Sequence, residues 1–148
     1  MAKKFAQGKY VPKNPKKYIG KKTPTYRSSW EFTFMTFCDN NPSIIQWASE
    51  SVQIPYRNPL TGNQTIYVPD FLIYYQDKTG QKHAELIEVK PKKQTTIEGA
   101  KRSPRDMAAV AVNYAKWEAA SAWTKRNGLT FRIVTEEDIY RSGSKKGK

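Results

Sequence analysis

The sequence feature that most constrains the fold is the stretch VPDFLIYYQDKTGQKHAELIEVKPKK, residues 68 to 93. Two apolar runs, rich in β-branched and aromatic residues, flank the polar segment QDKTGQ. This pattern predicts two strands joined by a hairpin turn. Charged residues nevertheless occupy strand positions: Asp70 lies at the start of the first run, and Glu88 and Lys90 lie near the end of the second. Their presence needs an explanation, because burying an unpaired charge is costly.

The spacing of the hairpin predicts that Asp70 and Glu88 are cross-strand neighbours. Side chains alternate between the two faces of a strand, so Glu88 and Lys90 point to the same side. With the turn centred between Lys78 and Thr79, Asp70 and Glu88 lie opposite each other to within about one residue of register. Two adjacent carboxylates repel each other, and a divalent cation would relieve that repulsion.

These residue types predict phosphodiester hydrolysis. Oxygen ligands suit a hard ion such as Mg²⁺, with Mn²⁺ as its substitute, and Mg²⁺ commonly binds through one or two carboxylates and a phosphate. The ion lowers the pKa of a bound water and screens the phosphodiester. Lys90, on the same side as the acids, can orient that water or stabilise charge on the phosphate. We therefore predict attack of water on a phosphodiester bond.

The distribution of charge favours a nucleic-acid partner. The 148 residues include 26 Lys and Arg against 13 Asp and Glu, a net charge of +13, which points to a polyanionic partner. The basic residues gather in segments 1–27, 91–105 and 141–148. Each tail alone could be a solubilising, disordered segment. Three such segments around one acidic constellation favour DNA.

Five basic residues beside the predicted site form a candidate DNA-binding rim, and the alternative is a mobile basic loop. Contacts to phosphate carry no sequence information, so we predict little sequence specificity. The rim consists of Lys92, Lys93, Lys101, Arg102 and Arg105.

Several classes of protein are disfavoured. No apolar run approaches the roughly 20 residues that span a bilayer, and the N-terminus lacks the apolar core of a signal peptide. A single cysteine, Cys38, and a single histidine, His83, leave no internal disulfide, thiol zinc cluster or multi-histidine site. We expect a reducing, intracellular setting, no membrane and no small-molecule substrate. We also expect Cys38 to pack on the first helix and His83 to lie on a strand surface near the turn.

The remaining pattern predicts an α/β domain with a mixed central sheet flanked by helices. Ser28 or Ser29 can cap a first helix with Glu31 in its first turn. A second short helix, or a continuation of the first, is expected over residues 43–50. Further elements are predicted as strands over 51–56, 65–75, 83–90 and 129–135, a long helix over 106–127, and a short helix over 136–140.

The predicted buried face of the long helix consists of Val110, Tyr114, Trp117 and Ala120. We divide the chain into a basic arm over residues 1–27, a nuclease domain over 28–140 and a basic tail over 141–148. The arm contains Tyr10, Tyr18 and Tyr26. These side chains could stack on bases or pack the arm onto the domain.

The segments around Asp70 and Glu88 resemble those of a known superfamily. VPDF followed by IEVK resembles the PD-(D/E)xK nuclease signature of the restriction-endonuclease-like fold. SSWEFTF, QIPY, YVPDF and EVKPKKQ, in that order, resemble the endonuclease subunit of heteromeric transposases. They are more similar still to the head completion nucleases of large tailed phages. The similarity covers roughly residues 26 to 135.

The resemblance implies roles for individual residues. Asp70 and Glu88 match the family's metal ligands, and Lys90 matches its catalytic lysine. Val89 matches the residue whose backbone carbonyl binds the metal. Glu31 matches an acid that assists metal binding from the first helix, and Gln53 is a weaker match.

The resemblance also implies a biological setting. It implies action on packaged double-stranded DNA during head completion and head–tail joining, with phage head, portal or neck proteins as partners. The implied location is the head–neck region of the virion, assembled in the host cytoplasm.

Other interpretations stay open from the sequence. The same fold could serve junction resolution, repair or transposon-end cleavage. Alternatively, the chain could be a non-catalytic structural protein of the virion that binds DNA ends. In that case Asp70 would cap a turn, Glu88 and Lys90 would form a solvated strand face, and Glu31 would cap a helix.

Overall fold

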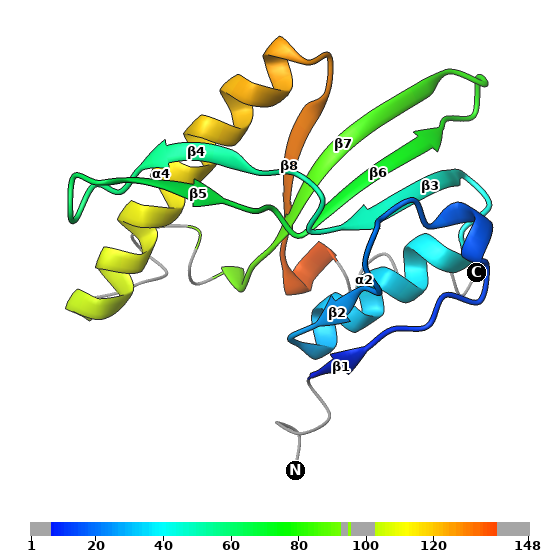
Figure 1. The fold of residues 1–148 in the computed structure, drawn as a ribbon, viewed down its shortest axis with the longest axis horizontal. Coiled ribbons are helices and arrows are strands. Elements are labelled where there is room, and N and C mark those ends of the chain that lie inside the picture. The colour runs from blue at the N-terminus through cyan, green and yellow to red at the C-terminus, as the bar shows by residue number, and fades with distance from the viewer. Residues whose placement is uncertain (1–6, 93–94, 96–102, 139–148) are drawn as a thin grey trace.

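A mixed four-stranded sheet lies at the centre of the computed structural model, which describes residues 7–92, 95 and 103–138 (Figure 1). Along the sheet the strand order is β3–β6–β7–β8. Strand β6 pairs antiparallel with β3 and β7, whereas β7 and β8 are parallel. The strands are β3 (Ile44–Ser49), β6 (Phe71–Gln76), β7 (Lys82–Val89) and β8 (Thr130–Val134). The predicted mixed sheet is therefore confirmed.

Two helices cover the sheet. Helix α2 (Ser29–Asn40) begins at Ser28, whose hydroxyl accepts a hydrogen bond from the Glu31 N–H at 3.1 Å. Helix α4 (Pro104–Arg126) connects β7 to β8, as a parallel strand pair requires. The predicted flanking helices are thus present, and the α/β class is confirmed.

Strand alternation sends side chains into two separate cores. On the α2 side, Phe71 and Ile87 pack with buried residues of that helix, such as Met35. On the α4 side, Leu72 and Leu86 pack with residues of that helix such as Trp117 and Ala120. Neighbouring residues of one strand therefore serve opposite cores, as a period of two demands.

A two-stranded ribbon stands apart from the sheet, over α4 (Figure 1). It consists of β4 (Ile54–Arg57) and β5 (Gln64–Tyr67). Ile54, Tyr56 and Tyr67 are buried in the α4 core, whereas Ile66 on the outer face is exposed. The ribbon therefore brings Tyr67 to the α4 side of the sheet, immediately before the chain enters β6.

The N-terminal segment packs against the domain. It forms β1 (Gly8–Lys9), the 3₁₀ helix η1 (Pro15–Lys17) and β2 (Thr25–Tyr26). The buried ring of Tyr10 meets Trp47 edge-on, and Tyr18 does the same at 4.7 Å between ring centroids. Of the two alternatives for these tyrosines, the structure supports packing onto the domain, and it extends the packed chain upstream of residue 28.

A single acid anchors that segment. Asp39, near the end of α2, is fully buried and accepts hydrogen bonds from the Tyr10 hydroxyl at 2.7 Å and from the backbone N–H groups of Lys13 and Asn14 at 2.7 and 3.0 Å. Lys17 Nζ donates to the backbone carbonyls of Asp39 and Asn41 at the end of the helix. This geometry satisfies both the acid and the last carbonyls of α2.

Two predicted elements were wrong. Residues 43–50 are not helical but form β3, because Asn41 and Pro42 end α2 and the following residues find hydrogen-bonding partners along β6. The single strand predicted over 65–75 is two strands, β5 and β6, separated at residues 68–70. Pro69 has no N–H to donate to a ladder, which explains the break.

One predicted core residue was also wrong. Tyr114 is 44% exposed, whereas Val110, Trp117 and Ala120 are buried as predicted. Polar residues complete the buried stripe of α4, with Asn113 among them. The rotation of the helix about its axis depends on packing against the ribbon, which its alanine-rich sequence does not specify.

The smaller expectations are met where the structure describes them. Cys38 is buried on α2, and His83 lies on β7 near the turn, where its Nε2 is 2.8 Å from an oxygen of Asp77. Residues 136–138 are helical, while Ile139 and Tyr140 lie outside the described residues, as does the tail 141–148. None of the described helices is both long and apolar enough to cross a membrane.

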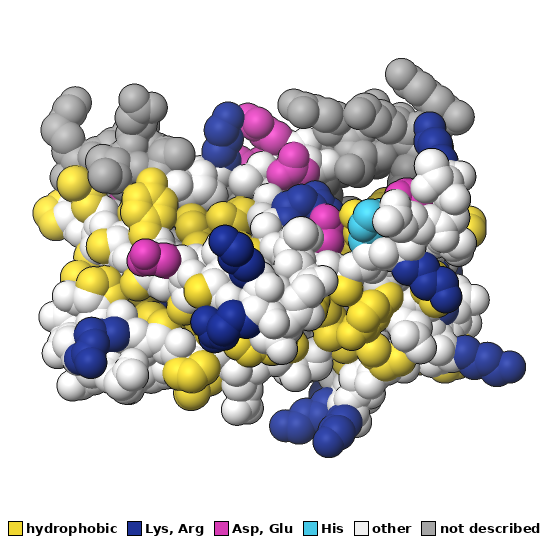
Figure 2. Space-filling view, turned by 90° about the horizontal axis from the view of Figure 1, so that it is seen from above, with side chains coloured by type: hydrophobic (Ala, Val, Ile, Leu, Met, Phe, Trp, Pro, Cys, Tyr) yellow, Lys and Arg dark blue, Asp and Glu magenta, His cyan; other side chains and the backbone are white. Residues whose placement is uncertain are grey.

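One face of the molecule shows how the charges are distributed. In Figure 2 the basic side chains are scattered over this face, with acidic ones beside several of them, and apolar surface lies next to the histidine. The described residues thus form no continuous basic patch there.

Candidate active site

The predicted register of the acid pair is confirmed. The β6–β7 ladder ends with Phe71 opposite Ile87, so Asp70 and Glu88 occupy the next positions on the two strands. There the Val89 N–H donates to Asp70 Oδ2 at 2.7 Å, in place of a regular ladder bond. The end of the hairpin therefore brings the two acids together on the α4 side of the sheet.

The break at Pro69 positions Asp70. The chain leaves β5 before Pro69, and at Asp70 it joins the β3–β6 pairing, where the Asp70 carbonyl accepts the Glu50 N–H at 2.9 Å. Glu50 follows the last residue of β3 and has a positive φ of 51°, which is uncommon for a residue other than glycine. Asp70 is thus held by its carbonyl to the residue that follows β3 and by its side chain to the end of β7.

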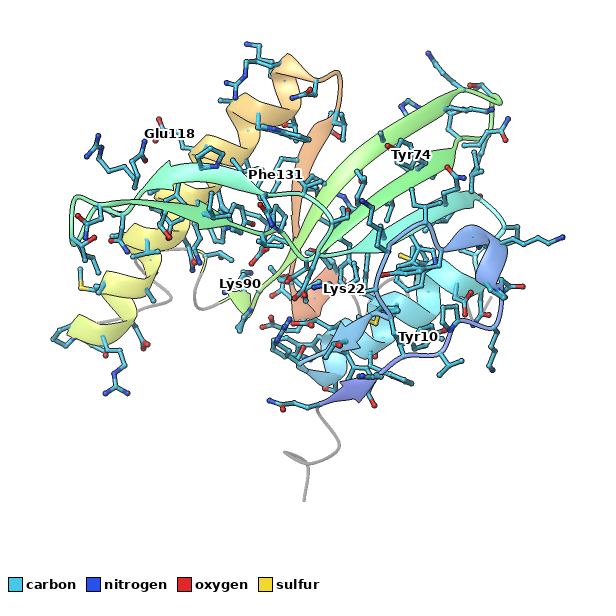
Figure 3. All side chains as sticks on the ribbon, in the orientation of Figure 1. Tyr10, Lys22, Tyr74, Lys90, Glu118 and Phe131 are labelled. Carbon is cyan, nitrogen blue, oxygen red and sulfur yellow. The ribbon has the colours of Figure 1, made fainter. Side chains whose placement is uncertain are left out.

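Glu88 is almost completely buried, with 5% of its surface exposed. The Tyr67 hydroxyl donates to Glu88 Oε1 at 2.7 Å. Lys90 Nζ lies 3.8 Å from Glu88 Oε2, so the two residues face the same side, as predicted. Figure 3 shows Lys90 at the end of β7, near the point where the β4–β5 ribbon joins the sheet.

The acids are electrostatically coupled. Burial, followed by the charges of Glu88 and Glu31, raises the pKa of Asp70 well above its ordinary value. Burial also raises the pKa of Glu88, although the Tyr67 hydroxyl, Lys90 and Lys116 oppose the rise. Burial and the charge of Glu88 in turn raise the pKa of Tyr67, so its hydroxyl remains a donor. Such perturbed groups are typical of functional sites.

Glu31 lies beside this pair and has structural bonds of its own. Its Oε1 accepts the Arg27 N–H at 2.9 Å. Burial raises the pKa of Glu31, and the charge of Glu50 acts in the same direction, while Arg27 and Lys90 oppose it. Arg27 also pairs with Glu50. Glu31 therefore acts electrostatically on Asp70, and its role as a metal ligand stays a prediction.

The donor set fits a hard divalent cation. Among the described residues, no hydrogen-bond donor engages Asp70 Oδ1, whereas Glu88 accepts from the Tyr67 hydroxyl and the Asp70 backbone and lies beside Lys90. Asp70 thus retains an oxygen for a ligand, and a cation would relieve the repulsion between the two acids. Within the described part of the chain, no group of three His, Cys, Asp or Glu side chains is placed to hold a metal. The ion would therefore need other oxygens, from backbone, water or phosphate.

Two residues near the acids were not predicted from the sequence. Tyr67 ends β5, and Lys116 extends from the middle of α4, with Nζ 5.5 Å from the centroid of the Tyr67 ring. Lys116 could have been noticed, because it lies one turn from the buried Asn113 and Ala120 on a largely apolar helix face. Tyr67 has no comparable signal, since an aromatic residue in a strand is ordinarily core.

The DNA-binding rim is only partly described. Lys92 Nζ pairs with Glu137 at 3.0 Å, and both side chains are solvent-exposed. Arg105 is exposed in the first turn of α4. Lys93, Lys101 and Arg102 lie outside the described residues. The role of all five stays a prediction.

Fold and site together define a class of protein: an α/β domain of the restriction-endonuclease-like kind, with an acid pair and a lysine at the end of its central hairpin. A family model for the TnsA-like endonuclease N-terminal domain matches residues 41–136. The chain is also 40% identical, over 148 aligned residues, to the head completion nuclease of Enterobacteria phage T4. That alignment covers 93% of this chain and 96% of the relative. The chain belongs to the TnsA-like endonuclease family.

Proposed function

We propose that this protein is a divalent-metal-dependent deoxyribonuclease, with Mg²⁺ as the natural ion and Mn²⁺ as a substitute. The observation that carries the proposal is the Asp70–Glu88 pair, in which Glu88 is buried and Asp70 partly buried, with Lys90 Nζ 3.8 Å from Glu88 Oε2. A structural role would not explain two electrostatically coupled acids side by side at the end of a strand pair. Membership of an endonuclease family supports the same conclusion.

In this proposal Asp70 and Glu88 hold the cation, with the Val89 carbonyl and Glu31 assisting. When bound, the ion lowers the pKa of a water and screens the negative phosphodiester. Lys90 places an ammonium beside Glu88, where it can orient the attacking water or bind the phosphate. The Tyr67 hydroxyl donates to Glu88 Oε1 and so fixes the orientation of a carboxylate that would hold the ion. Attack of the water oxygen on phosphorus would break one P–O ester bond, and the departing oxygen would take up the proton that the water loses, which leaves one hydroxyl end and one phosphomonoester end.

The partner is double-stranded DNA, read through its backbone. The net charge of +13 favours a polyanion. Lys92, Lys93, Lys101, Arg102 and Arg105 are proposed to bind phosphates, which carry no sequence information, so cleavage should show little sequence specificity. The proposed activity is endonucleolytic, exonucleolytic or both.

The biological role follows from the relative. The T4 protein is named a head completion nuclease, and 40% identity over almost the whole of both chains supports the same role here. We propose that this protein acts on packaged DNA in the head–neck region of a phage particle. Proteins of the head, portal or neck would be its partners.

The test is a cleavage assay on linear and supercoiled DNA, in Mg²⁺ and in EDTA. It compares the wild-type protein with Asp70→Asn, Lys90→Gln and, as a matched control, Glu118→Gln, an exposed acid on α4 (Figure 3). We expect cleavage that needs the ion, is lost in the first two variants and is kept in the control.

DNA binding by each variant is measured in parallel, so that loss of chemistry is separated from loss of affinity. A wild-type protein that binds DNA but does not cut it, whichever divalent ion is supplied, would contradict the proposal. It would favour the alternative of a structural DNA-end binder.

A further inference from the structure

The feature that carries a further inference is Lys116, in the middle of α4. Its side chain is only partly exposed. Among the described residues, no carboxylate oxygen lies within 4.0 Å of its Nζ, and none accepts a hydrogen bond from it. Removing an ammonium from water without an anionic partner is costly. The residue thus has the cost of burial without the ion pair that ordinarily offsets it.

The position of Lys116 relates it to the acid pair. Its Nζ lies over the ring of Tyr67, 5.5 Å from the centroid, and the hydroxyl of that ring is bonded to Glu88 at 2.7 Å. The charges of Glu88 and Asp70 attract Lys116, and the charge of Lys90 repels it. Two ammonium groups therefore face the acid pair. One belongs to Lys90, which follows β7, and the other to Lys116 on α4.

A bound cation changes this balance. Once the charge of Asp70 and Glu88 is neutralised by a divalent ion, their attraction for Lys116 falls and the repulsion from Lys90 and the ion remains. An anion placed between the ammonium groups of Lys90 and Lys116 would restore the electrostatic balance. The anion that the proposed reaction brings to this point is a phosphodiester of the DNA strand.

We propose that Lys116 binds a phosphate of the DNA strand at the acid pair, by donating a hydrogen bond from Nζ to a non-bridging oxygen. Lys116 is then a second basic residue of the site, contributed by α4 and independent of the strand that carries Lys90. This inference rests on the proposed nuclease function and names a contact that the family signature does not contain. The Tyr67 ring holds the Lys116 ammonium through a cation–π contact, and the hydroxyl of the same ring is bonded to Glu88.

The test combines cleavage with DNA binding in the full-length protein. Variants Lys116→Gln and Lys116→Arg are compared with Lys125→Gln, an exposed lysine about 13 Å further along the same helix. Single-turnover cleavage should fall at least tenfold in Lys116→Gln. It should be largely kept in Lys116→Arg, because arginine also binds phosphate, and it should be unchanged in the Lys125 control.

Binding of a short DNA duplex is measured over a range of salt concentrations. Each variant also carries Asp70→Asn, which is expected to abolish cleavage during the measurement. Loss of one phosphate contact should reduce the slope of log affinity against log salt by about 0.9. The melting temperature of each variant reports on folding. A role limited to packing on Tyr67 would instead lower the melting temperature and leave the salt slope unchanged.

The outcomes separate the two proposals. If wild type cleaves and Lys116→Gln matches it in rate and salt slope, the inference about Lys116 is wrong and the nuclease proposal stands. If wild type binds DNA but never cleaves, the nuclease proposal fails. The salt slope then still decides whether Lys116 contacts phosphate.

Discussion

Replacement of Asp39 tests how the N-terminal segment is held. In Asp39→Ala, three donors lose their acceptor: the Tyr10 hydroxyl and the backbone N–H groups of Lys13 and Asn14. Each unsatisfied buried donor costs about 1–3 kcal/mol. Because two of these bonds are only partly buried and can regain water, we expect a total loss of about 3–4 kcal/mol in the free energy of unfolding. Urea denaturation at pH 7 measures it.

Asp39→Asn keeps the shape of the side chain and removes its charge, so it separates the effect of the charge from the effect of packing. An amide has one acceptor oxygen where the carboxylate has two, so we expect a smaller loss, about 2 kcal/mol. Glu118→Gln, an exposed acid on the other helix, should change the free energy of unfolding by less than about 0.5 kcal/mol. A loss below about 1 kcal/mol in Asp39→Ala would refute the reasoning that this network anchors the segment.

The pH dependence gives an independent check. Burial alone would raise the pKa of Asp39, but hydrogen bonds from Tyr10, Lys13 and Asn14 outweigh it, so the pKa lies below its ordinary value. The folded state therefore binds this proton less readily than the unfolded state. The stabilisation is complete above the unfolded-state pKa, about 3.9, and is lost as pH falls through the folded-state value. Asp39→Asn should lack this part of the acid-induced loss.

Three further substitutions have expected outcomes. Tyr67→Phe removes the hydrogen bond to Glu88 and keeps the ring, so cleavage should fall about tenfold while stability changes by no more than about 1.5 kcal/mol; equal rates would mean that the hydroxyl does not orient the acid. Gly20→Ala places a Cβ against the Tyr18 hydroxyl, and thermal unfolding should show a loss of about 1–3 kcal/mol in the free energy of unfolding; an unchanged melting temperature would show that the Tyr18 side chain shifts without cost. Met35→Ala empties a fully buried position on α2 and should cost about 2–5 kcal/mol in urea denaturation; a smaller loss would indicate that the core collapses around the cavity.

The acid pair could be placed from sequence because local rules determine it. A short turn fixes the register of a hairpin, so the neighbourhood of Asp70 and Glu88 depends only on the residues between them. The capped start of α2 at Ser28 is local in the same sense. These are also the positions at which the family resemblance is strongest.

Other features depend on contacts between distant segments. Residues 43–50 are apolar enough for a helix or a strand, and only pairing with β6 decides between them. Lys116 reaches the site because α4 packs beneath the ribbon with one particular rotation, which the sequence of the helix does not reveal. The N-terminal segment is fixed by Asp39, which lies 22 to 29 residues away from its partners.

The central claim is that Asp70 and Glu88 form a site for a divalent cation. The most direct measurement is calorimetric titration of Mn²⁺ into the wild-type protein, Asp70→Asn and the Glu118→Gln control, without DNA. We expect saturable binding by wild type and control and at least a tenfold loss of affinity in Asp70→Asn, because one of the two proposed carboxylate ligands is gone. Equal affinity for Mn²⁺ in all three proteins would contradict it, since the ion would then bind elsewhere.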